Sequence, residues 1–110
     1  MMREVSLDAF AAAHADGAVV IDVREPYEYA TGHVPGARLL PLARLGLHAD
    51  ELPRTERVFL ICATGNRSLM AADYLARHDI DAISVAGGTS GWQGRGWPVQ
   101  RGMRSSTAAL

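Results

Sequence analysis

One cysteine, Cys62, stands where an apolar run ends and a polar loop begins. The run is "RVFLIC" at residues 57–62, and "ATGNRS" follows it at 63–68. A thiol is nucleophilic only as the thiolate, and a position just before a helix N-terminus favours that anion, because unpaired backbone N–H groups and the positive end of the helix dipole face it. The position therefore favours a reactive Cys62 over a buried, inert one.

The six residues after Cys62 are candidates for binding an anion. They are small or polar, and Gly65 can adopt a positive φ or allow close backbone approach, so that the loop amides turn inward. Arg67 is the only charged residue of this loop, and two roles stay open for it: it contacts an oxyanion substrate, or it joins the loop to a neighbouring carboxylate. The substrate-binding candidates are Ala63, Thr64, Gly65, Asn66, Arg67 and Ser68.

Two further charged residues, Asp22 and Arg24 in "DVRE", follow another apolar run. At a strand end they can tune the thiolate or shape the entrance to the site. The more common outcome for such residues is a structural ion pair, here with each other or with Glu28. His33 lies in "GHVPGA", a tight-turn sequence, and we expect its ring to cap that turn by hydrogen bonding.

The elements that must position these residues alternate along the chain. Short β-branched or apolar runs predict strands at 18–23, 37–40, 57–62 and 81–86. Helices are expected from the N-cap Ser6 to Gly17, from Pro26 to Gly32, and over 66–78. The inner stripe expected for the 66–78 helix is Leu69, Ala72, Leu75 and Ala76. This alternation predicts an α/β fold with a mostly parallel sheet, whose functional site lies at the carboxyl ends of the strands.

Composition excludes several other classes of function. The chain has 110 residues, 48% hydrophobic and 21% charged, which predicts one globular domain. A net charge of -1 gives no footprint for nucleic acid or an anionic membrane. All eleven cationic residues are Arg, so lysine Schiff-base and P-loop chemistry are excluded. A lone cysteine and histidines without ligand spacing predict no metal site.

The same sequence gives an expectation about location. No apolar run approaches the ~20 residues of a membrane span, and the N-terminus lacks the apolar core of a secretory signal. One cysteine forms no internal disulfide, which suits a reducing compartment. We expect a cytoplasmic protein.

Three quoted segments together resemble one family. "CATGNRS", "VVIDVREPYEYATGHVPGA" upstream and "VAGGTSGWQGRGWPV" downstream are similar to the rhodanese family of single-domain sulfurtransferases, from about Val19 to Val99. The resemblance implies a three-layer α/β/α fold with a five-stranded, mostly parallel sheet. It predicts one rhodanese-like domain over residues 1–103, followed by a flexible tail at 104–110.

The resemblance also implies an activity that needs no cofactor. Cys62 would take a sulfane sulfur, from thiosulfate or a persulfide donor, and pass it to cyanide or a thiol in a ping-pong reaction. The amides of residues 63–68 would bind the transferred sulfur, which agrees with the anion-binding loop deduced above. The partners implied are a small sulfur donor, a thiol or cyanide acceptor, and alternatively a protein donor or acceptor.

Two rival interpretations remain. Dual-specificity phosphatases, whose fold resembles that of rhodaneses, have five residues between cysteine and arginine. Cys62 and Arg67 are separated by four, which makes a smaller cradle suited to sulfur. The alternative to an enzyme is a rhodanese-like sulfur carrier or regulatory protein-binding module without significant thiosulfate turnover. The presence of Cys62 favours the enzyme or the carrier over a purely regulatory module.

Overall fold

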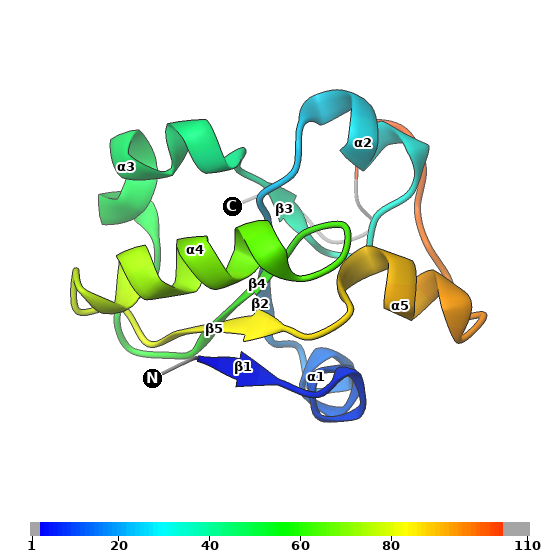
Figure 1. Cartoon of the computed structure of the whole chain (residues 1–110), viewed down its shortest axis with the longest axis horizontal. Helices are drawn as coiled ribbons and strands as arrows, with labels where there is room; N and C mark the ends of the chain where they lie inside the picture. Colours follow the sequence, from blue (N-terminus) through cyan, green and yellow to red (C-terminus); the bar gives the residue numbers. More distant parts are fainter. Residues whose placement is uncertain (1–2, 105–110) are drawn as a thin grey trace.

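A five-stranded sheet forms the centre of the molecule. The computed structural model describes residues 3–104, and the expected tail falls, apart from Arg104, outside the described residues. All strand pairs of the sheet are parallel, and the strand order is β1-β5-β4-β2-β3 (Figure 1). The strands are β1 (Glu4–Val5), β2 (Val19–Asp22), β3 (Arg38–Leu39), β4 (Val58–Ile61) and β5 (Ala82–Val85).

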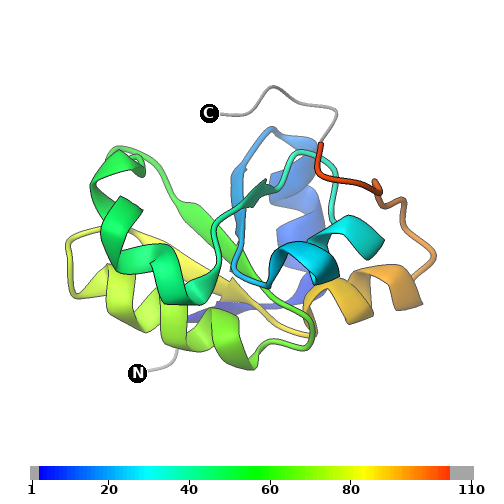
Figure 2. The same ribbon diagram turned by 90° about the horizontal axis from the view of Figure 1, so that it is seen from above.

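Helices cover both faces of this sheet (Figure 2). They are α1 (Leu7–Ala15), α2 (Pro26–Thr31), α3 (Leu45–His48), α4 (Asn66–Ala76) and α5 (Gly88–Gly94), with 3₁₀ turns at Leu42–Arg44 and Ala49–Glu51. Alternate strand residues point to opposite faces, and so the core has two clusters. One cluster packs the sheet against α3 and α4, and the other packs it against α1, α2 and α5. The predicted three-layer α/β/α fold is confirmed.

Most of the local predictions hold. Ser6 caps α1, because its hydroxyl oxygen accepts a 3.1 Å hydrogen bond from the Ala9 amide. Pro26 begins α2, and Gly32 ends it. Both follow from the residue types, since a hydroxyl satisfies an unpaired helix amide and proline fixes a helical φ where no amide is needed.

Two local features differ from the sequence interpretation. The strand patterns did not reveal β1, which has two residues and pairs with β5 at the sheet edge. The buried face of α4 consists of Ser68, Ala71, Ala72 and Leu75, whereas Leu69 and Ala76 are half-buried. The buried face includes Ser68 because its hydroxyl has two buried partners, Cys62 Sγ and Ser84 Oγ.

The parallel strands bring the candidate residues together at their carboxyl ends, on one side of the sheet. Asp22 ends β2 and is paired in register with Ile61, the last residue of β4. Cys62 is therefore the first residue after the carboxyl end of β4, and the Gly87–Gly88 turn follows the carboxyl end of the neighbouring strand β5. Within residues 3–104, no helix combines the length and apolar character that crossing a membrane requires.

Candidate active site

The loop between β4 and α4 wraps around the Cys62 sulfur. The Gly65 amide donates to Sγ at 3.1 Å and the Ser68 amide at 3.4 Å. Gly65 has φ +111°, a conformation that a side chain would strain, and this turn allows the loop amides to face inward. The predicted inward-facing loop is therefore present around a side chain that is 1% exposed.

The loop carbonyls face away from the sulfur and are held by α5. The Thr89 amide donates to the Cys62 carbonyl at 2.8 Å, and the Ser90 amide donates to the Ala63 carbonyl at 2.9 Å. These two bonds fix the first two peptide planes of the loop, Cys62–Ala63 and Ala63–Thr64, against the start of α5. Gly88 at the start of α5 allows this close approach, because a Cβ there would lie 2.5 Å from the Cys62 carbonyl oxygen.

A chain of buried hydroxyl groups reaches the sulfur from the sheet. Ser68 Oγ lies 3.3 Å from Cys62 Sγ and 2.7 Å from Ser84 Oγ on β5. A thiolate has no proton, so Ser68 must donate to it, and Ser84 must then donate to Ser68. Ser84 was missed from the sequence, where its only signal is a serine within the otherwise apolar "AISV" strand.

These contacts decide the ionisation of the thiol. Burial raises the pKa of Cys62, but hydrogen bonds from the Ser68 hydroxyl and from the amides of Ser68, Gly65 and Thr64 outweigh it, and the pKa lies below its usual value. The site therefore stabilises an anionic sulfur with dipoles and hydrogen bonds. Among the described residues, no group of three His, Cys, Asp or Glu side chains could hold a metal ion.

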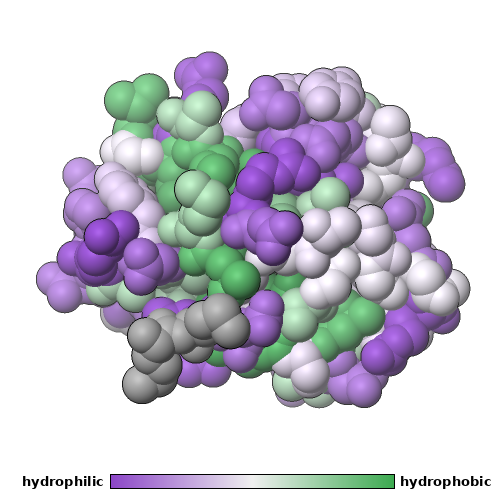
Figure 3. All heavy atoms as spheres, in the orientation of Figure 1, coloured by the Kyte–Doolittle hydropathy of each residue, from purple (hydrophilic) through white to green (hydrophobic). Residues whose placement is uncertain are grey.

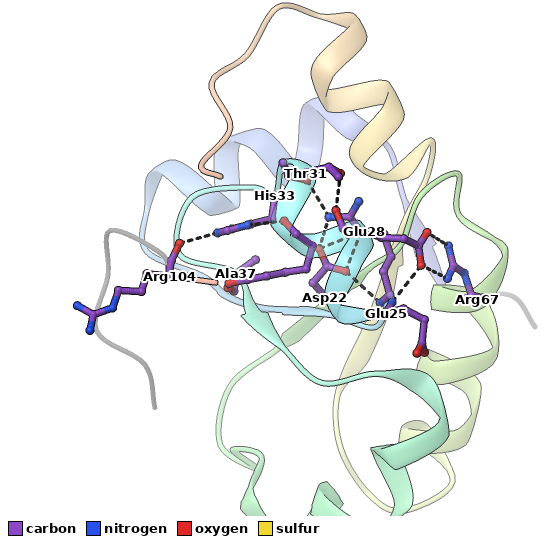
Figure 4. Close-up of polar contacts among 11 residues, drawn as sticks. Asp22, Glu25, Glu28, Thr31, His33, Ala37, Arg67 and Arg104 are labelled. Atoms are coloured by element: carbon purple, nitrogen blue, oxygen red, sulfur yellow. Dashed lines mark hydrogen bonds and ion pairs between the residues drawn. The ribbon is translucent and has the colours of Figure 1, made fainter. Parts of the chain in front are cut away.

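Arg67 takes the second of its two predicted roles in this structure. Its Nη1 and Nη2 donate to the two carboxylate oxygens of Glu28 at 2.7 and 2.8 Å, and Figure 4 shows the two side chains pointing at each other. The ion pair joins the cysteine loop to α2. The hydrogen bond from Arg67 lowers the pKa of Glu28 to about 2, so this carboxylate stays charged at neutral pH.

Asp22 and Arg24 form the structural ion pair that the sequence favoured. Asp22 is fully buried and Arg24 is 5% exposed. The Arg24 guanidinium donates to both Asp22 carboxylate oxygens, the shortest contact being 2.8 Å from Nη2, and also to the Gly32 carbonyl at 2.9 Å. The pair therefore fastens the end of β2 to the end of α2, the helix that carries Glu28.

His33 has a structural position away from the cysteine loop (Figure 4). It is fully buried, and its ring stacks on Tyr29 with 3.6 Å between the ring centroids. Nδ1 lies 2.9 Å from the Tyr29 carbonyl oxygen and Nε2 lies 3.0 Å from that of Arg104. The ring is hydrogen-bonded as expected, but its partners are carbonyls of α2 and the C-terminal segment rather than groups of the tight turn itself.

The hydroxyl chain gives the first testable prediction. We expect Ser84→Ala to raise the pKa of Cys62, because Ser68 loses the donor that orients its hydroxyl toward the thiolate. Less thiolate at pH 7 should slow alkylation by iodoacetamide about fivefold, as expected for the loss of roughly 1 kcal/mol of hydrogen bonding. The pH profile of alkylation measures this. Ser90→Ala, which removes an exposed hydroxyl on α5, is the control. An unchanged pH profile in Ser84→Ala would refute a role for the hydroxyl chain in the ionisation of Cys62.

The contact between α5 and the loop gives the second testable prediction. A Cβ on Gly88 would lie 2.5 Å from the Cys62 carbonyl oxygen and 2.6 Å from that of Ala63, at φ +57°. We expect Gly88→Ala to lower the free energy of unfolding by about 1–3 kcal/mol and to slow Cys62 alkylation. Gly94→Ala, in the same helix with nothing within 4 Å, should have no such cost. Urea unfolding of both variants decides, and equal stabilities would contradict the prediction.

The fold and the site together define a class of protein: an α/β domain with an inward-facing cysteine loop at the carboxyl end of its parallel sheet. The model of the rhodanese-like domain matches residues 6–95, and the chain belongs to this family. It is 35% identical over 95 residues to the Bacillus subtilis protein named "Putative sulfur carrier protein YrkF", with 84% of this chain covered. This chain spans about half of that relative, 51% of its length.

Solved structures show the same relationship. A rhodanese-related protein from Thermoplasma volcanium is 28% identical with a TM-score of 0.84, over 93% of this chain and 99% of that one. A thiosulfate sulfurtransferase from Pseudomonas aeruginosa has a TM-score of 0.83 at 23% identity, over 96% of this chain and 20% of the other, and shows the shared fold alone. Family membership supports sulfur transfer as the general chemistry of this domain.

Proposed function

We propose that this protein is a sulfurtransferase in which Cys62 carries a sulfane sulfur as a persulfide. The observation that supports this most is the set of donors converging on Sγ, the Gly65 and Ser68 amides and the Ser68 hydroxyl. A persulfide ends in a compact anionic sulfur one bond beyond Sγ, and inward N–H groups stabilise such an anion without a cofactor.

The proposed reaction has two steps. The Cys62 thiolate attacks the outer sulfur of the donor, which is thiosulfate or a persulfide, and sulfite or a thiolate leaves. Cyanide or a thiol then removes the sulfur and regenerates the thiolate. The amides of residues 63–68 bind the transferred sulfur, and Arg67 holds this loop against α2 through its ion pair with Glu28. A reducing compartment such as the cytoplasm suits this cycle, because the low-pKa thiolate must stay reduced.

Asp22 and Arg24 have a supporting role in this proposal. Through the Gly32 carbonyl they hold the end of α2, and α2 presents Glu28 to Arg67. They are positioning residues, since their side chains are buried and satisfied by each other. We propose that they keep the loop in the shape that binds sulfur.

Steady-state kinetics test the two-step reaction. Initial rates of thiocyanate formation, measured over a range of donor concentrations at several fixed cyanide concentrations, should give parallel double-reciprocal lines, as ping-pong transfer requires. Intersecting lines would mean that both substrates are bound before sulfur moves. That result would contradict a free persulfide on Cys62.

A sulfur carrier that serves another protein is the second candidate. An apolar surface on α3 and α4 favours it: Figure 3 shows apolar side chains gathered where these helices lie, and Leu47 and Met70 on them are 77% and 64% exposed. Exposed apolar side chains of this size are typical of protein contacts. Slow turnover with cyanide, combined with rapid loading of Cys62, would favour the carrier over the enzyme.

A further inference from the structure

The charges around the cysteine loop alternate and cancel in pairs. Asp22 faces Arg24, and Glu28 faces Arg67. The Cys62 thiolate is then the one group of these five without an opposite charge in contact, and the Arg67 guanidinium, the loop's only cation, is already paired. An anionic substrate therefore meets a site whose formal charge is already negative.

The pairing of Arg67 is built into the fold. Both of its terminal nitrogens are used by Glu28, in the bidentate geometry that is strongest for this pair. Glu28 is fixed in turn, because one of its carboxylate oxygens accepts the Glu25 amide at 3.0 Å in the capping box of α2. Releasing Arg67 to a substrate would leave the Glu28 carboxylate, 20% exposed, without its counter-ion.

Thiosulfate and hydropersulfides place different charge in this site. Thiosulfate brings two negative charges, whereas a hydropersulfide with an uncharged alkyl group carries at most one. The loop amides offer dipoles to either donor, but only an unpaired cation would offset a dianion next to a thiolate. In this site the Arg67 guanidinium is the cation that could do so, and it is already bound to the Glu28 carboxylate.

From this arrangement we infer that Glu28 sets the donor specificity of the site: by holding Arg67, it favours low-charge persulfide donors over thiosulfate. The inference rests on the sulfur-transfer function proposed above and names its donor class. In the loading step, Cys62 Sγ attacks the terminal sulfur of R–S–SH. The Sγ–S bond forms, the S–S bond of the donor breaks, its electron pair leaves with R–S⁻, and the terminal sulfur keeps its proton, which gives Cys62–S–SH.

Glu28→Gln is the variant that tests this. Glutamine keeps an oxygen that accepts the Glu25 amide, as is common at this capping-box position, so α2 remains capped. Arg67 loses its counter-ion and becomes available to an anion. Glu25→Gln is the matched control, because it removes a carboxylate that forms no ion pair with Arg67 and keeps an oxygen for the capping box of α2.

The measurement is the initial rate at which reduced protein gains one sulfur on Cys62, followed by intact-protein mass spectrometry. The donors are thiosulfate and the hydropersulfide of N-acetylcysteamine. We expect Glu28→Gln to load from thiosulfate about tenfold faster than wild type, with hydropersulfide loading changed less than about twofold. Glu25→Gln should match wild type with both donors.

Wild-type protein gives a second readout that needs no substitution. Loading from thiosulfate should accelerate as salt rises from about 20 to 200 mM, because screening weakens repulsion between like charges, whereas hydropersulfide loading should change little. An unchanged or slower thiosulfate rate in Glu28→Gln, or equal acceleration with both donors, would overturn the inference. If neither donor loads wild-type protein, the proposed function itself fails.

Discussion

Cys62→Ser should fold like the wild-type protein and transfer sulfur at least about 1000-fold more slowly, as the loss of a nucleophile generally does. Serine is close to cysteine in size, and the side chain is 1% exposed, so its neighbours keep their packing. A hydroxyl at this position cannot hold a sulfane sulfur. Thiocyanate formation from either donor measures the loss, and thermal unfolding confirms the fold.

A matched variant separates the nucleophile from the loop around it. Ser68→Ala keeps Cys62 and the loop amides but removes the hydroxyl 3.3 Å from Sγ. It should retain more activity than Cys62→Ser, with a shifted pH profile, because it changes the ionisation of the thiol rather than removing it. Equal losses in both variants, or activity above about 1% in Cys62→Ser, would contradict the assignment of the nucleophile.

The largest effect on stability is expected for Asp22→Ala. Asp22 is fully buried, and its carboxylate accepts from the Arg24 backbone amide at 3.1 Å as well as from the Arg24 guanidinium. Without it, a guanidinium that is 5% exposed loses its counter-ion. We expect the free energy of unfolding to fall by about 3–5 kcal/mol, as measured for broken buried pairs in other proteins. Urea unfolding gives this value.

The double variant Asp22→Leu/Arg24→Met is the control for this prediction. It replaces both charges with apolar side chains, and such replacements are often neutral because neither charge then has to be desolvated. It should therefore be more stable than Asp22→Ala. A single variant as stable as wild type would show that the Arg24 charge reaches solvent, in conflict with its burial.

The sequence predicted those features that depend on neighbours along the chain. The strand at 57–62 corresponds to β4, and the polar loop after it does surround Cys62, because an apolar run, a glycine and an amphipathic helix follow one another directly. The Ser6 cap and the Pro26 start of α2 are equally local. Residue types alone carry such signals.

The features that the sequence did not reveal depend on contacts distant along the chain. Strand β1 has two residues, too few for a periodic pattern, and it forms by pairing with β5 near the other end of the chain. Arg67 and Glu28 are 39 positions apart, so the carboxylate that pairs with Arg67 could be expected but not identified. Ser84 reaches the site only because β5 lies beside β4.

Whether Cys62 carries the sulfur is decided by intact-protein mass spectrometry of the fully reduced chain after incubation with a sulfur donor. We expect a gain of one sulfur atom that is absent in Cys62→Ser and is removed by cyanide, with thiocyanate formed in equal amount. No gain from either thiosulfate or a hydropersulfide, or a gain that persists in Cys62→Ser, would contradict the claim that Cys62 carries the sulfur.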